Sequence, residues 1–99
     1  MTGFVRQPHT ERIRSGAGGQ QRIYRFANGY GASVVRGAGT YGGTAGLWEL
    51  AVLEWHGEKP QLSYDTPITA DVIGWLDEDA VEATLDRIES LPVHAAVTA

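Results

Sequence analysis

The chain has 99 residues, no cysteine and a formal net charge of −4. This length fits one domain with a single core, and the lack of cysteine excludes disulfides, thiolate metal sites and a cysteine nucleophile. The charge is divided along the chain: residues 1–46 contain six arginines against one acid, and residues 47–99 contain eleven acids against Lys59 and Arg87. Such a division indicates a polyanion-binding arm, an acidic interaction surface, or two halves that neutralise each other in the fold.

The first twenty residues mix arginine, glutamine, glycine and serine without apolar periodicity. We therefore expect residues 1–20 to be a flexible basic arm. The arm has neither the basic start nor the apolar stretch of a secretory signal, and no apolar stretch of the chain reaches the roughly 18–20 residues of a membrane span. The expectation is a cytoplasmic protein that does not enter a membrane.

Three antiparallel strands are predicted in succession, over residues 21–26, 30–36 and 47–55. Asn28 and Gly29 join the first two strands, and these residue types favour a type I′ turn, which needs a positive φ at both central positions. Five glycines between residues 37 and 46 predict a long, flexible loop before the third strand.

A fourth strand is predicted over residues 61–64, after a tight turn, and it completes a four-stranded antiparallel meander. Residues 70–76 are predicted to form a short helix over the sheet. Asp77 or Asp79 is expected to cap the main helix, which runs to Ser90.

One apolar stripe runs along the main helix, where Val81, Leu85 and Ile88 recur at helical spacing. This stripe predicts that the amphipathic helix packs on the sheet. The expected fold class is therefore α+β, with a single domain over residues 21–92 and a disordered tail over residues 93–99.

The third strand is apolar on both faces, whereas a half-solvated antiparallel strand alternates apolar and polar residues. One main helix covers only one face, which leaves the other to the short helix, the arm or a second chain. We favour a second chain, in a homodimer. The predicted partner-binding residues are two tryptophans of this strand and the acidic face of the helix: Trp48, Trp55, Glu78, Glu82 and Asp86. A solvated helix face is the simpler interpretation of the acids.

Two alternative functions use other residues. The glycine-rich loop matches G-x-G-x-x-G, a pattern whose backbone amides can approach a phosphate, although here it does not open a helix as a dinucleotide site requires. The candidate residues for a small ligand or nucleotide are Gly37, Gly39, Tyr41 and Gly42. Nucleic-acid binding would use the arginines Arg6, Arg12, Arg14 and Arg22, and the acidic total of the chain disfavours it.

The residue types that enzymes commonly use in catalysis are dispersed along this sequence. His9, His56 and His94 lie in the arm, a turn and the tail, at no spacing that builds a metal site. The serines have neither a G-x-S-x-G elbow nor a recognisable base. We therefore predict no catalytic residue, no metal site and no cofactor, and the protein is not expected to be an enzyme.

Several sequence blocks are similar to proteins of one group: N-G-Y-G-A-S-V-V, G-L-W-E-L-A-V-L and Y-D-T-P-I-T, followed by I-G-W-L and D-R-I-E-S-L-P. Over about residues 23–92 the chain resembles small, functionally unassigned accessory proteins encoded by phages of actinobacteria. The resemblance implies a phage origin and assigns no residue-level site. Small phage proteins often bind and disable host machinery, so we expect a protein that binds a host or phage macromolecule, in the first place a protein, for instance in counter-defence.

Overall fold

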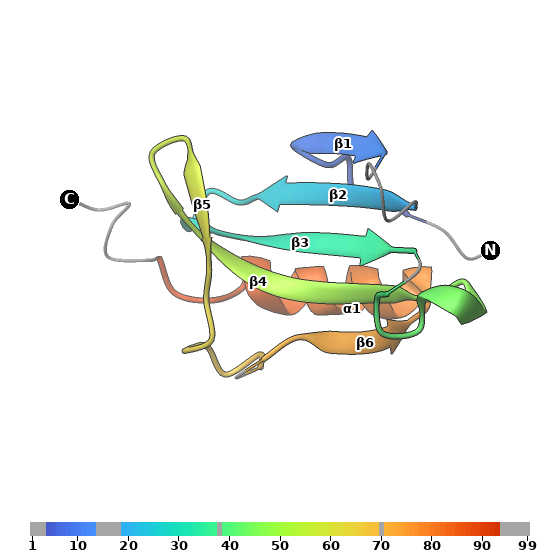
Figure 1. The fold of residues 1–99 in the computed structure, drawn as a ribbon. Coiled ribbons are helices and arrows are strands. Elements are labelled where there is room, and N and C mark those ends of the chain that lie inside the picture. The colour runs from blue at the N-terminus through green and yellow to red at the C-terminus, as the bar shows by residue number, and fades with distance from the viewer. Residues whose placement is uncertain (1–3, 14–18, 38, 70, 94–99) are drawn as a thin grey trace.

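The computed structural model of the chain describes residues 4–13, 19–37, 39–69 and 71–93. Over these residues the fold is α+β, with one antiparallel sheet and an α-helix that covers one of its faces (Figure 1). The elements are β1 (Thr10–Ile13), β2 (Gln20–Arg25), β3 (Tyr30–Arg36), the 3-10 helix η1 (Gly43–Ala45), β4 (Trp48–His56), β5 (Lys59–Leu62), β6 (Ile73–Leu76) and α1 (Glu78–Glu89). The predicted class, the antiparallel sheet and the C-terminal helix are confirmed.

The sheet has more strands than the four predicted. Neighbouring strands pair from β1 through to β5, and β6 pairs with β4 on the same edge as β5. The predicted meander corresponds to β2–β5, and the additional strands are β1 and β6. Each of these has only four residues, and backbone pairing with a longer neighbour holds it in the sheet.

The N-terminal segment is not the flexible arm that was predicted, because residues 4–13 pack onto the domain. β1 pairs antiparallel with β2, and the N–H of His9 donates to the C=O of Ile23 (2.7 Å). Backbone N–H and C=O groups at the edge of β2 find their partners in β1. This pairing is made by the backbone, so β1 can form without alternating apolar and polar residues. Residues 14–18 of the predicted arm and residues 94–99 of the predicted tail lie outside the described residues.

The predicted short helix over residues 70–76 is also wrong, since Ile73–Leu76 form β6; residue 70 lies outside the described residues. In β6, Leu76 lies opposite Trp48 and Ile73 lies opposite Leu50. A short apolar run cannot be assigned to a helical turn or a strand by periodicity alone. The free edge of β4 offers backbone N–H and C=O groups to a neighbouring strand, and pairing with them favours the extended conformation of β6.

The turn between β2 and β3 differs from the predicted type I′ turn. Gly29 has a φ of 88°, but Asn28 does not have a positive φ. The C=O of Phe26 accepts a hydrogen bond from the N–H of Gly29 (3.1 Å), and the N–H of Phe26 donates to Tyr30 (2.8 Å). The connection therefore has three residues and ends on a left-handed glycine, a common alternative hairpin loop.

The side chain of Asn28 explains this loop, because it is buried and bound to the end of α1. Its Nδ2 donates to the C=O groups of Ile88 (2.9 Å), Glu89 (3.2 Å) and Leu91 (3.1 Å), and its Oδ1 accepts from the N–H of Tyr30 (3.0 Å). Carbonyl groups at the C-terminal end of a helix lack partners within the helix. Asn28 therefore caps α1 and fastens it to the hairpin.

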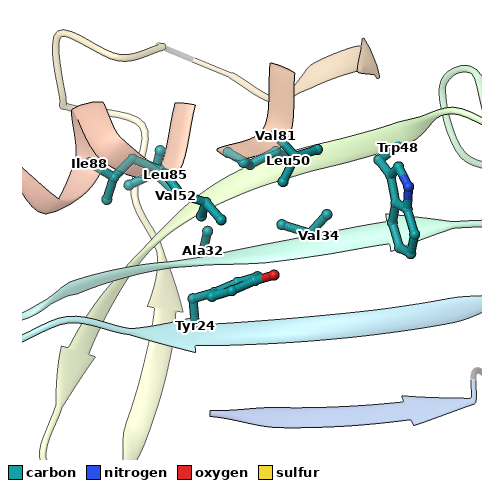
Figure 2. Close-up of a cluster of buried hydrophobic side chains, with 9 residues drawn as sticks. All are labelled: Tyr24, Ala32, Val34, Trp48, Leu50, Val52, Val81, Leu85 and Ile88. Carbon is teal, nitrogen blue, oxygen red and sulfur yellow. The ribbon is translucent and has the colours of Figure 1, made fainter. Parts of the chain in front are cut away.

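α1 begins at the predicted cap, where the Asp77 carboxylate accepts from the N–H of Ala80 (2.7 Å). The apolar stripe of α1 faces the sheet, and its side chains point toward those of β4 and β3 (Figure 2). The buried core consists of Tyr24, Ala32, Val34, Trp48, Leu50, Val52, Val81, Leu85 and Ile88.

The opposite face of β4 is also buried, within a single chain. Its apolar residues are Ala51, Leu53 and Trp55. The indole of Trp55 lies over Gly31, where a side chain would overlap it, and its Nε1 donates to the C=O of Tyr24 (3.0 Å). The ring of His9 packs edge-on against Trp55, with the ring centroids 5.1 Å apart. A second chain is therefore not needed to explain why β4 is apolar on both faces.

Candidate functional site

The two tryptophans predicted to bind a partner are packing residues. Trp48 is 2% exposed and Trp55 is 5% exposed. Trp48 packs against the ring of Phe4, with the ring centroids 5.1 Å apart. Guanidinium groups lie over both indoles, that of Arg36 at 4.3 Å from the ring centroid of Trp48 and that of Arg25 at 4.6 Å from Trp55. A partner cannot reach these rings in the folded chain, so this part of the predicted site is corrected.

The predicted acidic face of α1 and the predicted basic arm bind each other. The guanidinium of Arg6 donates to Glu82 (3.0 Å), Asp86 (2.6 Å) and Glu89 (2.6 Å), and Glu82 also accepts from the backbone N–H groups of Val5 and Arg6 (both 3.1 Å). Partial burial acts to lower the pKa of Arg6, but the hydrogen bonds to Glu89, Asp86 and Glu82 outweigh it and raise this pKa. At this contact Arg6 of the predicted basic arm is therefore engaged by three carboxylates of the predicted acidic face.

Arg22 is engaged within the chain in the same way. Its guanidinium donates to Glu11 (2.8 Å) and to the hydroxyl oxygen of Tyr24 (2.8 Å), and it lies 4.1 Å from the ring centroid of Phe4. Burial acts to lower the pKa of Arg22, and the contacts with Tyr24 and Glu11 raise it overall. This guanidinium is already paired with a carboxylate and stacked on a ring.

The remaining predicted residues do not add a charged site. Arg12 lies in β1, and Arg14 lies outside the described residues. Glu78 lies in the first turn of α1, between Asp77 and Asp79, where carboxylates interact favourably with the helix dipole. The structure thus brings Arg6 together with Glu82 and Asp86, and it leaves Glu78 apart from them in an ordinary N-terminal turn.

The glycine-rich loop between β3 and β4 is closed by its own hydrogen bonds and is not the flexible connector that was predicted. Internal bonds use the backbone N–H groups of Gly37, Thr40, Gly43, Ala45, Gly46 and Leu47. The carboxylate of Glu49 accepts from the N–H of Tyr41 (2.9 Å), so this amide already binds an anionic group of the chain. The predicted ligand residues lie in this closed loop: Gly37, Gly39, Tyr41 and Gly42.

Two exposed aromatic residues come together where this loop meets β6. Tyr41 is 62% exposed and Trp75 is 64% exposed, and the N–H of Trp75 donates to the C=O of Tyr41 (3.3 Å). Within the described part of the chain, neither ring stacks on another ring or on a guanidinium. We call these two side chains the aromatic surface. Tyr41 was predicted only as a ligand residue, and Trp75 was not predicted as a site residue.

Two glycines permit the contact that forms the aromatic surface. A Cβ atom on Gly74 would overlap the Cβ of Tyr41, and a Cβ on Gly42, whose φ is 86°, would lie 2.9 Å from the Cα of Trp75. Side chains at these positions would separate the loop from β6. The glycines of the loop were a signal for close backbone approach, but the sequence does not indicate that the approaching segment is β6.

Trp75 itself has an unusual backbone. Its φ is 61°, and no other non-glycine residue of the described ranges has a positive φ. A bulky residue in this region costs about 1–3 kcal/mol. The pairing of β6 with β4 is irregular between Trp48 and Leu50, and such bulges redirect side chains. Trp75 therefore combines a strained backbone with a ring that is mostly in solvent.

Groups typical of catalysis remain dispersed in the fold. His9 packs on Trp55, the imidazole of His56 lies 3.6 Å from the carboxylate of Glu54, and His94 lies outside the described residues. In the described ranges, no three His, Cys, Asp or Glu residues are grouped so as to hold a metal ion. No helix in those ranges is long and apolar enough to span a membrane.

Comparison with known proteins adds no further residues to this site. A scan against protein-family models, a search of curated proteins and a search of solved structures found no match.

Proposed function

We propose that the chain is a non-enzymatic protein that binds a protein partner through the aromatic surface of Tyr41 and Trp75. The observation that carries this proposal is the exposure of both rings at one contact between the loop and β6. Tyrosine and tryptophan are enriched in protein interfaces and commonly dominate their binding energy.

The strained backbone of Trp75 supports the same function. Strained residues persist where the surrounding structure imposes the conformation, and they cluster at functional sites. Glycine would remove the strain at this position, and a smaller polar residue would remove the exposed ring. The stability of the free chain therefore does not account for a tryptophan at position 75, whereas burial of the ring in an interface does.

The nature of the partner is proposed from the resemblance to accessory proteins of actinobacteriophages. This resemblance supports a host or phage protein as the partner, a role in counter-defence, and the cytoplasm of the bacterial host as the location. The sequence blocks support the identity of the partner, and the aromatic surface supports the place where the partner binds.

The homodimer remains a prediction, but its original argument no longer holds, because one chain buries both faces of β4. If two copies associate, the aromatic surface is an exposed apolar site that they can share. Light scattering of the purified chain measures this directly: twice 10.7 kDa indicates a dimer, and 10.7 kDa excludes one at the concentration used.

The proposal is tested with Trp75→Gly. A partner captured by the wild-type chain from host lysate is identified, purified and titrated by calorimetry against the wild-type and variant chains. We expect Trp75→Gly and Tyr41→Ala each to weaken binding at least about tenfold. The free energy of unfolding of Trp75→Gly should stay within about 1 kcal/mol of wild type, since strain is relieved while chain entropy is added.

The matched control is Leu62→Ser, which removes another exposed apolar side chain from the same edge of β4. Its affinity for the partner should stay within about twofold of wild type, as expected for a change outside the interface. An unchanged affinity in Trp75→Gly, or an equal loss in Leu62→Ser, would contradict binding at the aromatic surface.

A further inference from the structure

We infer that the partner presents an arginine-bearing segment to the aromatic surface, with a guanidinium stacked on Trp75 or Tyr41 and paired with the carboxylates of Asp71 and Asp77. This inference rests on the proposed function and adds the chemistry of the partner. It follows from the charges beside the surface and from how the rest of the fold treats its aromatic rings.

The segment around Trp75 is acidic and contains no basic residue of its own. Residues 60–86 contain seven acids and neither lysine nor arginine. Asp71 and Asp77 are exposed, four residues before and two residues after Trp75, so their Cα atoms lie within about 14 Å and about 7 Å of its Cα. Neither forms an ion pair with a described residue. Acids farther along α1 do form an ion pair, since Arg6 binds Glu82.

Other aromatic rings of the fold already bind arginine. Arg36 lies over Trp48, Arg25 lies over Trp55, and further arginines lie over Phe4, Tyr24 and Phe26, at 4.1–5.7 Å from the ring centroids. Of the three tryptophans, Trp75 alone has no guanidinium over its ring within the described residues.

Stacked guanidinium groups are attracted by the ring quadrupole, most strongly over tryptophan. Arginine also pairs with carboxylates through a planar set of donors, which lysine lacks. An exposed tryptophan with carboxylates on both sides along the chain, neither of them in an ion pair with a described residue, is therefore complementary to arginine and repels an acidic segment.

The emission of Trp75 provides a direct test, because Trp48 and Trp55 are buried and only Trp75 is exposed to an added peptide. The probes are acetylated hexapeptides of alternating glycine with arginine, lysine or glutamate. We expect the arginine peptide to change the emission, with an affinity at least about threefold higher than that of the lysine peptide. The glutamate peptide should not bind, and Trp75→Phe should remove the signal.

A pair of charge variants separates local pairing from net charge. Asp71→Asn with Asp77→Asn should weaken binding of the arginine peptide by about threefold to tenfold, and asparagine at position 77 retains an oxygen to cap α1. Glu58→Gln with Asp86→Asn changes the net charge equally but alters exposed acids outside the Trp75 segment, so its affinity should change by less than about twofold.

The outcomes distinguish this inference from the proposed function. Equal losses in the two double variants, equal affinity for arginine and lysine, or no emission change up to about 1 mM arginine peptide would overturn the arginine segment. If the captured partner still binds the Asp71/Asp77 variant with wild-type affinity but loses binding to Trp75→Gly, protein binding stands and the arginine segment is wrong. If Trp75→Gly retains the partner, the proposed function itself fails.

Discussion

Replacing Asn28 with alanine tests how the helix is held to the sheet. The variant loses the Oδ1 acceptor of the Tyr30 N–H and the two Nδ2 hydrogens that the C=O groups of Ile88, Glu89 and Leu91 share. A hydrogen bond contributes about 0.5–1.5 kcal/mol net, and a buried group left unsatisfied costs about 1–3 kcal/mol. With one acceptor and two donor hydrogens removed, we expect the free energy of unfolding to fall by about 2–4 kcal/mol.

Urea denaturation, followed by far-ultraviolet circular dichroism, measures this loss. Asn28→Asp provides a second variant, which keeps the acceptor but places a carboxylate against the negative end of the helix dipole. At neutral pH it should be less stable than Asn28→Ala, and it should recover part of the loss below about pH 4, where a protonated carboxyl can donate. A loss below about 0.5 kcal/mol in both variants would refute the role of Asn28 as the cap of α1.

Three further predictions concern packing and charge. Gly31→Ala should lower the free energy of unfolding by about 2–4 kcal/mol, because the added methyl overlaps the C=O of Tyr24 and displaces the Trp55 indole; a stability equal to wild type in urea would show that the indole lies elsewhere. Glu82→Gln should cost about 1 kcal/mol and accelerate hydrogen exchange at the Arg6 amide, and unaltered exchange would argue against the docked N-terminal segment. Burial raises the pKa of Tyr24, so the contribution of this residue to stability should be constant below about pH 10 and fall above it, where the unfolded chain ionises first. Tyr24→Phe should remove that alkaline decline, and a decline that persists in the variant would assign it to other groups.

The elements that could be predicted are those whose signals lie within a few residues of one another in the sequence. The Asn28-Gly29 signal between β2 and β3, the apolar length of β4 and the Asp77 cap of α1 are all properties of neighbouring residues. β1 and β6 could not be predicted in this way, because each depends on the free backbone edge of a strand distant in sequence.

The candidate site was harder to predict for the same reason. Arg6 and Glu82 are 76 residues apart in the chain, so composition revealed both charged segments but not that they bind each other. The pattern around Tyr41 indicated close backbone approach, whereas the fold alone shows that the approaching residues are Gly74 and Trp75. The strained φ of Trp75 leaves no mark in the sequence.

Hydrogen exchange of the chain in complex with its captured partner tests binding at the aromatic surface most directly. Partner binding should slow exchange in residues 39–42 and 73–76, which form the contact between the loop and β6, and leave exchange in β1 as in the free chain. Protection confined to β1 and α1, with unchanged exchange in β6, would place the partner on the face where Arg6 meets the acids of α1, and it would contradict the proposed function.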